Sequence, residues 1–225
     1  MSRRLNLREE LLRRGGLDQA ARSAVASGGE AAFQRVMAMD DENAAWLGEV
    51  IGKAGWPGRS AVGEDGAHMA WLLAQHADRH PRLQRQCLAL LRQAVAAGEA
   101  SAADLAHLTD RVLLASGKAQ IYGTQLVARH GRFVARRLRD PETVDDRRSA
   151  AGLKPLQASL DDAQELYGPP SPVPVQCRGC HNEIQVWLPE AGSRMTVECA
   201  ACGSVMTLRL RYGATPPRSR TPARF

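Results

Sequence analysis

Aromatic residues are scarce in this chain of 225 residues, at 4% of the sequence, although hydrophobic residues make up 44%. The core must therefore be built mostly from Leu, Ala and Val, which favours packed helices over a β-sandwich. No apolar run approaches the ~18 residues of a membrane-spanning helix. The first residues also lack the apolar centre of an export signal. We therefore expect a cytoplasmic protein with no membrane partner.

Lysine is also rare, since only three of the 30 basic residues are lysine. This preference for arginine, together with much alanine and glycine, indicates a GC-rich bacterial source. The net charge of +6 is spread thinly, because residues 1–174 contribute +2, residues 175–212 contribute +1 and the tail at residues 213–225 contributes +3. Since no folded part is strongly basic, charge supports a nucleic-acid partner only weakly.

Apart from Cys87, cysteine is confined to two pairs near the end of the chain. Two residues separate Cys177 from Cys180 and Cys199 from Cys202, and 18 residues separate the pairs. This spacing is typical of a four-thiolate zinc site, with bonds of about 2.3 Å to each sulfur. Four thiolates leave no open position for a substrate, so we expect a structural Zn²⁺. A pair of disulfides is the weaker alternative, because nothing suggests export.

Short alternating runs follow each cysteine pair, at residues 184–188 and 205–211. Strands joined by two cysteine turns resemble a zinc ribbon, and this resemblance covers residues 175–212. Gly203 directly follows Cys202, where a positive φ is often needed. After Cys180 the corresponding residues are His181 and Asn182, and asparagine is the more tolerant of that conformation.

The remaining chain divides into three parts around this ribbon. Residues 1–167 are expected to form a mainly α-helical domain with a small β-hairpin, and the zinc ribbon adds a small C-terminal β domain. Residues 168–174 are rich in proline and predict an extended linker. Residues 213–225 predict a disordered basic tail.

Apolar spacing and turn residues place the elements of the helical domain. Residues 59–66 are expected to be a loop, and a break is possible at Gly15 and Gly16. The expected helices cover residues 3–25, 30–53, 66–80, 81–97, 101–117, 140–152 and 157–167. The expected hairpin pairs residues 121–127 with residues 133–138.

Three polar stretches follow one another in the helical domain. The first is Gln75-His-Ala-Asp78, the second runs from Asp110-Arg to Gln-Ile-Tyr-Gly-Thr-Gln125, and the third runs from Val144-Asp-Asp-Arg-Arg to Gly-Leu153. In this order they resemble a bacterial domain family of unknown function, over roughly residues 5–160. The resemblance implies a candidate site and no reaction. Its matching polar positions are His76, Asp110, Arg111, Gln120, Tyr122, Gln125, Asp145 and Arg148.

His76 is the centre of this candidate catalytic site. It follows Leu72 and Leu73 at helical spacing, so its side chain points inward and a buried imidazole needs a partner. The possible partners are Asp110, Asp145 and Tyr122. A histidine held by a carboxylate beside Arg111 or Arg148 would suit acid–base chemistry or anion binding.

A second polar group surrounds Gly123 and is a candidate ligand-binding site. Its members are Gln120, Tyr122, Thr124 and Gln125. Amide and hydroxyl groups crowded beside a glycine are more typical of ligand recognition than of a core. The opposing interpretation is a buried structural network that ties the hairpin to the helices, and the sequence favours it slightly.

These features favour a bacterial zinc-binding protein that acts by binding an unknown protein partner or small ligand. The first alternative is a hydrolase or transferase on a small polar or anionic substrate, using the site of His76, Asp110, Arg111 and Tyr122. The second alternative is nucleic-acid binding through the ribbon and the arginine-rich hairpin at residues 129–139.

Overall fold

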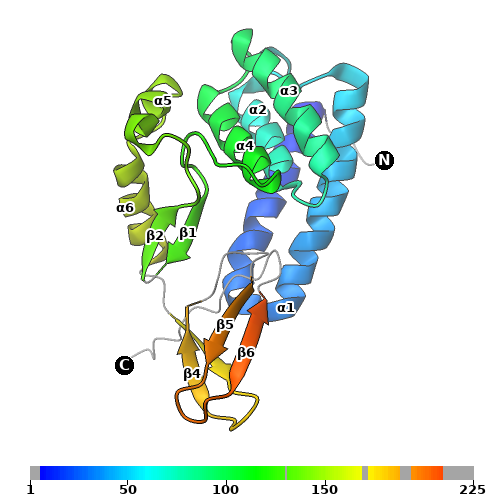
Figure 1. Cartoon of the computed structure of the whole chain (residues 1–225). Helices are drawn as coiled ribbons and strands as arrows, with labels where there is room; N and C mark the ends of the chain where they lie inside the picture. Colours follow the sequence, from blue (N-terminus) through cyan, green and yellow to red (C-terminus); the bar gives the residue numbers. More distant parts are fainter. Residues whose placement is uncertain (1–5, 130, 169–171, 188–193, 210–225) are drawn as a thin grey trace, which may run out of the picture.

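A computed structural model describes residues 6–129, 131–168, 172–187 and 194–209. It is mainly helical, with small β-hairpins, as the sequence predicted (Figure 1). The first four helices pack together on one side of the molecule. They are α1 (Leu7–Ala54), α2 (Arg59–His76), α3 (Pro81–Ala96) and α4 (Ala102–Ala115).

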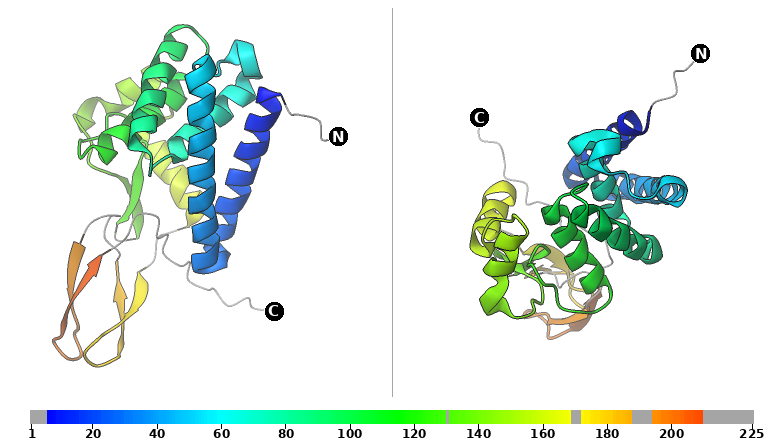
Figure 2. Two further views of the ribbon diagram at one scale, coloured as in Figure 1. Left: turned by 90° about the vertical axis from the view of Figure 1, so that its right-hand side faces the viewer. Right: turned by 90° about the horizontal axis from the view of Figure 1, so that it is seen from above.

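Helix α1 is folded back on itself into an antiparallel helical hairpin (Figure 2). The fold occurs at Gly29, whose φ of 59° and ψ of −153° interrupt the helical backbone. Asn6 caps the start of the helix through a reciprocal pair of hydrogen bonds with Glu9. Across the hairpin, Arg14 Nη1 donates to Asn43 Oδ1 at 2.9 Å. The two helices predicted on either side of residue 29 are thus confirmed.

The possible break at Gly15 and Gly16 does not occur, because both residues lie inside the first half of α1. Gly15 instead allows a close approach between helices. A Cβ atom at this position would lie 2.1 Å from the sulfur of Met69 on α2. The absence of a side chain at residue 15 is therefore a packing requirement of the α1–α2 contact.

The loop predicted at residues 59–66 is wrong, because α2 begins at Arg59 and bends at Gly63, where φ is 75°. The first turn is capped by a residue far away in the sequence. Glu99 accepts hydrogen bonds from the backbone amides of Arg59, through its carbonyl oxygen, and of Ser60, through its carboxylate. A cap supplied by tertiary contact leaves no local signal in the glycine-rich segment.

The core of the helical domain lies between α1, α2, α3 and α4. Its fully buried side chains include a leucine from each helix, namely Leu11, Leu73, Leu91 and Leu108. Cys87 is buried among them, as expected for a core residue. Burial raises the pKa of its thiol to about 12, so this cysteine is chemically inert at neutral pH.

A second group of elements packs beside α4. Strand β1 (Leu126–Arg129) pairs antiparallel with β2 (Arg132–Ala135), which confirms the predicted hairpin. It is followed by the 3-10 turn η1 (Pro141–Thr143) and helices α5 (Val144–Ala150) and α6 (Leu156–Tyr167). Helix α6 covers β2, with the Phe133 and Tyr167 rings 5.9 Å apart. Within the described residues, no helix is long and apolar enough to cross a membrane.

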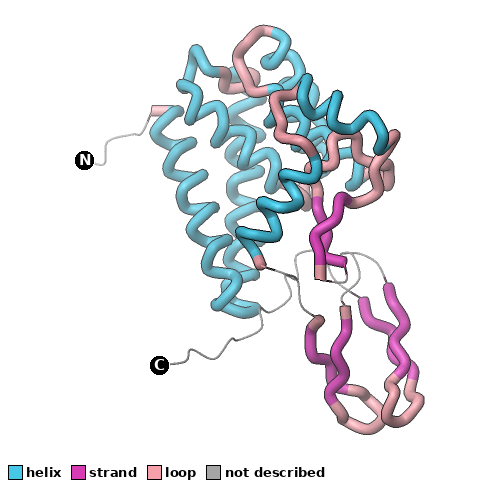
Figure 3. The backbone as a smooth tube through the Cα atoms, turned by 90° about the vertical axis from the view of Figure 1, so that its left-hand side faces the viewer, coloured by secondary structure: helices cyan, strands magenta, loops and turns pink. Residues whose placement is uncertain are grey.

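The C-terminal part consists of two more hairpins (Figure 3). Strand β3 (Val173–Gln176) pairs with β4 (Glu183–Val186), and β5 (Arg194–Glu198) pairs with β6 (Val205–Arg209). The sequence predicted β4 and β6 but missed β3 and β5. Strand β3 starts inside the expected linker, whose residues 169–171 lie outside the described residues, as does the expected tail at residues 213–225.

Candidate functional site

The four C-terminal cysteines lie in two turns of the same geometry. In the β3–β4 turn, the Cys177 amide donates to Asn182 O at 2.9 Å; in the β5–β6 turn, the Cys199 amide donates to Ser204 O at 2.9 Å. The amides of His181 and Gly203, in turn, donate to the carbonyl oxygens of Cys177 and Cys199. The two turns therefore share one pattern of backbone hydrogen bonds.

Positive φ angles occur at the residue that directly follows each cysteine pair. They are 60° at His181 and 70° at Gly203. The expectation for Gly203 is confirmed. In the first turn the strained position is His181 and not the more tolerant Asn182. A histidine is thus held in a conformation that glycine adopts more readily.

The four sulfurs converge on one point. Cys177 Sγ lies 3.6 Å from Cys202 Sγ, Cys180 Sγ lies 3.7 Å from Cys199 Sγ, and all four sulfurs lie within 4.8 Å of one another. Zinc–sulfur bonds of about 2.3 Å in a tetrahedron separate neighbouring sulfurs by about 3.8 Å. These separations are longer than a disulfide bond of about 2.05 Å, and all five cysteines are free. The donor set and spacing fit a metal ion such as zinc.

Small residues allow the two cysteine turns to approach each other. A Cβ atom at Gly179 would lie 2.1 Å from the hydroxyl oxygen of Ser204 and 3.4 Å from Cys202 Sγ. The Gly179 amide donates to Cys177 Sγ at 3.3 Å, a contact that stabilises the charged thiolate form required for metal binding.

In the helical domain, Asp110 organises the loop that connects α4 to β1. Its carboxylate is fully buried and accepts hydrogen bonds from the amides of Ile121, Tyr122 and Thr124 and from the Thr124 hydroxyl, at 2.7 to 3.2 Å. The sequence suggested Asp110 as a partner of His76. The structure uses both of its oxygens to hold the loop that carries Tyr122 and Thr124.

Gln120 and Arg148 complete this buried frame. Gln120 bonds the backbone of Gln125 on one side and of Arg136 on the other. Arg148 is 2% exposed and donates to two carbonyl oxygens, those of Tyr122 and Lys154, and to the Ser159 hydroxyl. Burial lowers the pKa of Arg148, although the nearby Asp145 and Asp110 carboxylates oppose the shift. These contacts support the structural interpretation of Gln120 and Arg148.

Two further predicted residues also have defined partners. Asp145 accepts a hydrogen bond from the Leu156 amide at 2.7 Å and so caps the start of α6. Arg111 forms a two-point ion pair with Asp78 at 2.7 and 2.8 Å and donates to Gln125 Oε1 at 3.0 Å. Burial would raise the pKa of Asp78, but its bonds and charge interaction with Arg111 hold that pKa below its usual value.

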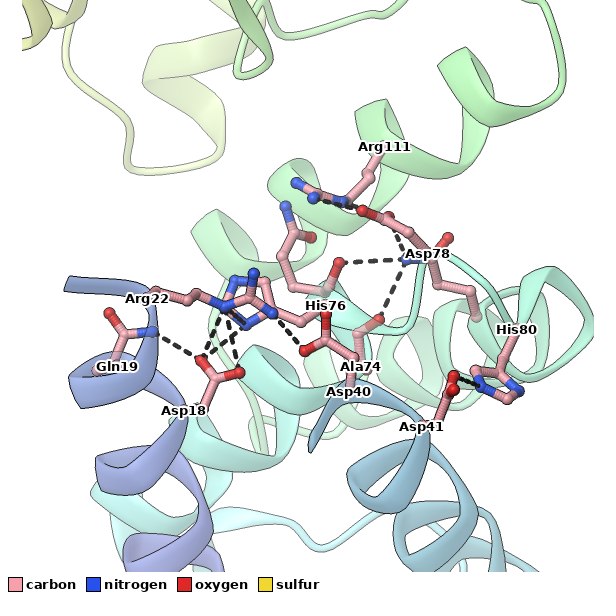
Figure 4. Close-up of polar contacts among 12 residues, drawn as sticks. Asp18, Gln19, Arg22, Asp40, Asp41, Ala74, His76, Asp78, His80 and Arg111 are labelled. Carbon is pink, nitrogen blue, oxygen red and sulfur yellow. Dashed lines mark hydrogen bonds and ion pairs between the residues drawn. The ribbon is translucent and has the colours of Figure 1, made fainter. Parts of the chain in front are cut away.

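His76, the last residue of α2, belongs to a different cluster. This cluster lies where the end of α2 meets the two halves of α1 (Figure 4). Its Nδ1 atom is 2.9 Å from Asp18 Oδ2 and 3.0 Å from Arg22 Nε. Arg22 also contacts Asp40 through its Nη2 atom. The carboxylate beside His76 is thus Asp18, where the sequence suggested Asp110 or Asp145.

The two aspartates of this cluster differ in their acidity. Burial would raise the pKa of Asp18, but the His76 hydrogen bond and the charges of His76 and Arg22 bring it below its ordinary value. Burial also acts on Asp40, and there it outweighs Arg22 and raises the pKa. Asp18 is therefore the carboxylate that stays charged most readily.

Residues 5–169 match the family described as "Family of unknown function (DUF6624)". The chain belongs to this family. No curated protein and no solved structure matches the chain. The DUF6624 match includes the helical domain and its three polar stretches and ends before the cysteine turns. The four-cysteine cluster is thus an addition to the DUF6624 region.

Sequence reasoning missed three members of the His76 cluster, which are Asp18, Arg22 and Asp40. The i,i+4 spacing of Asp18 and Arg22 is a local signal, but it is also the spacing of an ordinary surface ion pair. Only the fold of α1 at Gly29 brings Asp40 beside them.

Proposed function

We propose that this chain is a zinc-binding interaction protein. Cys177, Cys180, Cys199 and Cys202 hold one structural Zn²⁺, and the two hairpins that the ion joins present a surface to a protein partner. The observation that supports the proposal is the convergence of four free thiols at the spacing of a tetrahedral zinc site.

A structural role for the ion agrees with the small core of the hairpins. The buried cluster here consists of Cys177, Cys199 and Met206, with a few partly buried neighbours. This small apolar core stabilises the two hairpins only weakly. Metal binding must therefore supply much of their folding free energy. The ion therefore acts on the partner surface indirectly, by fixing the relative positions of the hairpins.

The partner surface is expected on β6 and its surroundings. Val205, at the start of β6, is 65% exposed and offers an apolar contact there. An exposed valine on a strand edge favours contact with another protein chain over contact with a charged polymer.

Metal analysis of the full chain, purified under reducing conditions, tests the zinc proposal. We expect one zinc ion per chain, and loss of that ion from the double variant Cys177→Ser/Cys199→Ser. The matched control is Cys87→Ala, which removes a thiol from the helical core and leaves the zinc content unchanged. A zinc content near zero in the reduced wild-type protein would contradict the proposal.

The enzyme alternative now depends on fewer residues. Asp110 and Arg148 are engaged in holding the loop at residues 120–125, so a hydrolase or transferase would use His76 with Asp18 as its orienting carboxylate. A carboxylate–histidine pair is a common general base. The binding function is better supported, since Arg111 is paired with Asp78 and bonds the Gln125 side chain.

Nucleic-acid binding is the remaining alternative, through the ribbon and the β1–β2 hairpin. It predicts an affinity that falls steeply with salt concentration. The charge of residues 175–212, at +1, offers little support. A binding assay with single- and double-stranded oligonucleotides at two salt concentrations separates this function from a protein partner.

A further inference from the structure

A second group of metal-ligating side chains lies about Arg22, in the helical domain. Asp18, Asp40 and His76 each offer one ligand atom, and these three atoms lie within 4.8 Å of one another. They come from the first half of α1, its second half and the C-terminal end of α2 (Figure 4). Three separate backbone segments are thus required to assemble the group, and packing fixes all of them.

The group is screened from solvent. The side chain of Asp18 is 1% exposed, that of Asp40 is 11% exposed and that of His76 is 15% exposed. Charged carboxylates at such sites need a compensating cation, because their transfer from water is costly.

The positive charge in contact with the group is incomplete. Among the described residues, Asp18 and Asp40 both form their arginine ion pair with Arg22, so two carboxylates share one guanidinium. The neighbouring Asp78 has its own partner in Arg111. When both aspartates are charged, the group carries one excess negative charge if His76 is neutral and none if His76, whose Nδ1 lies 2.9 Å from Asp18, is protonated.

The contact geometry around His76 suits a metal ion. Nδ1 of His76 and Oδ2 of Asp18 are 2.9 Å apart. This is the length of a hydrogen bond, and it is also close to the separation of about 3.0 Å between two neighbouring ligands of an octahedral ion with bonds of about 2.1 Å. The Nδ1 lone pair that coordinates an ion would also accept a hydrogen bond from Arg22 Nε, which lies 3.0 Å away. Arg22 and a metal ion therefore compete for the same atoms.

We propose that Asp18, Asp40 and His76 form a site for a divalent transition-metal ion, and that the Arg22 guanidinium must move aside for the ion to bind. Two carboxylate oxygens and one imidazole nitrogen are donors suited to Mn²⁺, Co²⁺ or Zn²⁺, whereas Mg²⁺ prefers an all-oxygen site. Arg22 is 31% exposed, so its guanidinium can turn toward solvent. The site is independent of the four cysteines and of the function proposed for them.

Mn²⁺ is the suitable probe, because hard oxygen ligands favour it and four thiolates do not. We would titrate the full chain, with its cysteine site loaded with zinc, and follow free Mn²⁺ by electron paramagnetic resonance. One Mn²⁺ ion per chain is expected. His76→Ala and Asp40→Asn should each weaken binding at least about tenfold, since each removes one of three ligands.

The variant at Arg22 gives the sharpest test. Arg22→Ala removes the competing cation, so Mn²⁺ should bind about tenfold more tightly than to the wild type. Arg22→Gln has the same expected direction and keeps a polar side chain, which guards against poor folding of the alanine variant. If Asp18, Asp40, His76 and Arg22 form only a structural ion-pair network, both Arg22 variants should be less stable than the wild type and should not bind Mn²⁺.

A matched control is available four residues along the chain from His76, in the link between α2 and α3. His80 Nε2 lies 2.8 Å from Asp41 Oδ1, so the chain has another histidine–aspartate pair nearby, on a more exposed surface. His80→Ala and Asp41→Asn should leave Mn²⁺ binding unchanged, as should Cys177→Ser/Cys199→Ser. The absence of Mn²⁺, Co²⁺ and Zn²⁺ binding at this group in the folded wild-type, Arg22→Ala and Arg22→Gln proteins would overturn the proposal.

Discussion

Asp110 is a single residue on which a whole loop depends. Its buried carboxylate accepts five hydrogen bonds from Ile121, Tyr122 and Thr124. Asp110→Asn places an amide donor against backbone donors, and we expect it to lower the free energy of unfolding by about 2–4 kcal/mol. Urea denaturation measures this loss. The control Asp146→Asn, at an exposed position on α5, should change stability by less than about 0.5 kcal/mol.

A result for Asp110→Asn no larger than that of the control would mean that the loop at residues 120–125 is held by other contacts. The comparison therefore measures how much the buried hydrogen bonds of Asp110 contribute to stability.

Opposite substitutions at the positive-φ residues of the two cysteine turns test whether backbone strain affects zinc binding. Gly203→Ala forces a side chain into the left-handed region, at about 1 kcal/mol, which weakens zinc binding about fivefold if folding and binding are coupled. His181→Gly relieves the same strain in the other turn and should tighten binding by a similar factor. Competition with a chromogenic chelator measures both. Equal affinities for the two variants would show that backbone strain does not limit zinc binding.

Local chemistry explains which of these residues could be found from the sequence. The cysteines and Gly203 are recognised by spacing within a few positions, so they were predicted correctly as a cluster and a turn. Asp18 could not be recognised, since its partner His76 lies on another helix. Gln120, Thr124 and Gln125 do lie close together, but their bonding to one another depends on Asp110 and on backbone positions that no pattern specifies.

At the scale of elements, the glycines of α1 have opposite roles that the sequence does not separate. Gly15 and Gly16 look like a helix break but lie inside the helix, because Gly15 faces Met69 in a close contact. Gly29 makes the actual turn. Periodicity identified both halves of α1 correctly. Only packing against α2 shows why a glycine occupies position 15 inside a helix.

Substitution by alanine tests these roles. Gly16→Ala should stabilise the protein by about 0.5–1 kcal/mol, because the helical site has open space for a Cβ atom. Gly29→Ala should destabilise it by about 1–3 kcal/mol through backbone strain alone, since its Cβ atom also meets nothing within 4 Å. Thermal unfolding of the two variants measures the difference. Effects of the same sign would contradict the assignment of the turn to Gly29.

At the scale of the whole molecule, composition determines the fold class but not the arrangement of its parts. A chain poor in aromatics and rich in Leu and Ala was expected to be helical, and it is. Strands β3 and β5 were missed, and β3 contains Pro174 and follows a proline-rich segment. Both are defined by pairing with β4 and β6, which is a tertiary property.

The separation of the helical core from the cysteine cluster predicts how the molecule responds to loss of metal. The helical core of Leu11, Leu73 and Leu108 and the cysteine cluster are separate groups of buried residues, so their stabilities should be separable. Addition of a strong chelator under reducing conditions should make residues 173–209 sensitive to protease while the helical circular-dichroism signal persists. Peptide mapping locates the cuts, and re-addition of Zn²⁺ should restore protection. Loss of the helical signal together with protection would mean that the zinc ion stabilises the helical domain as well.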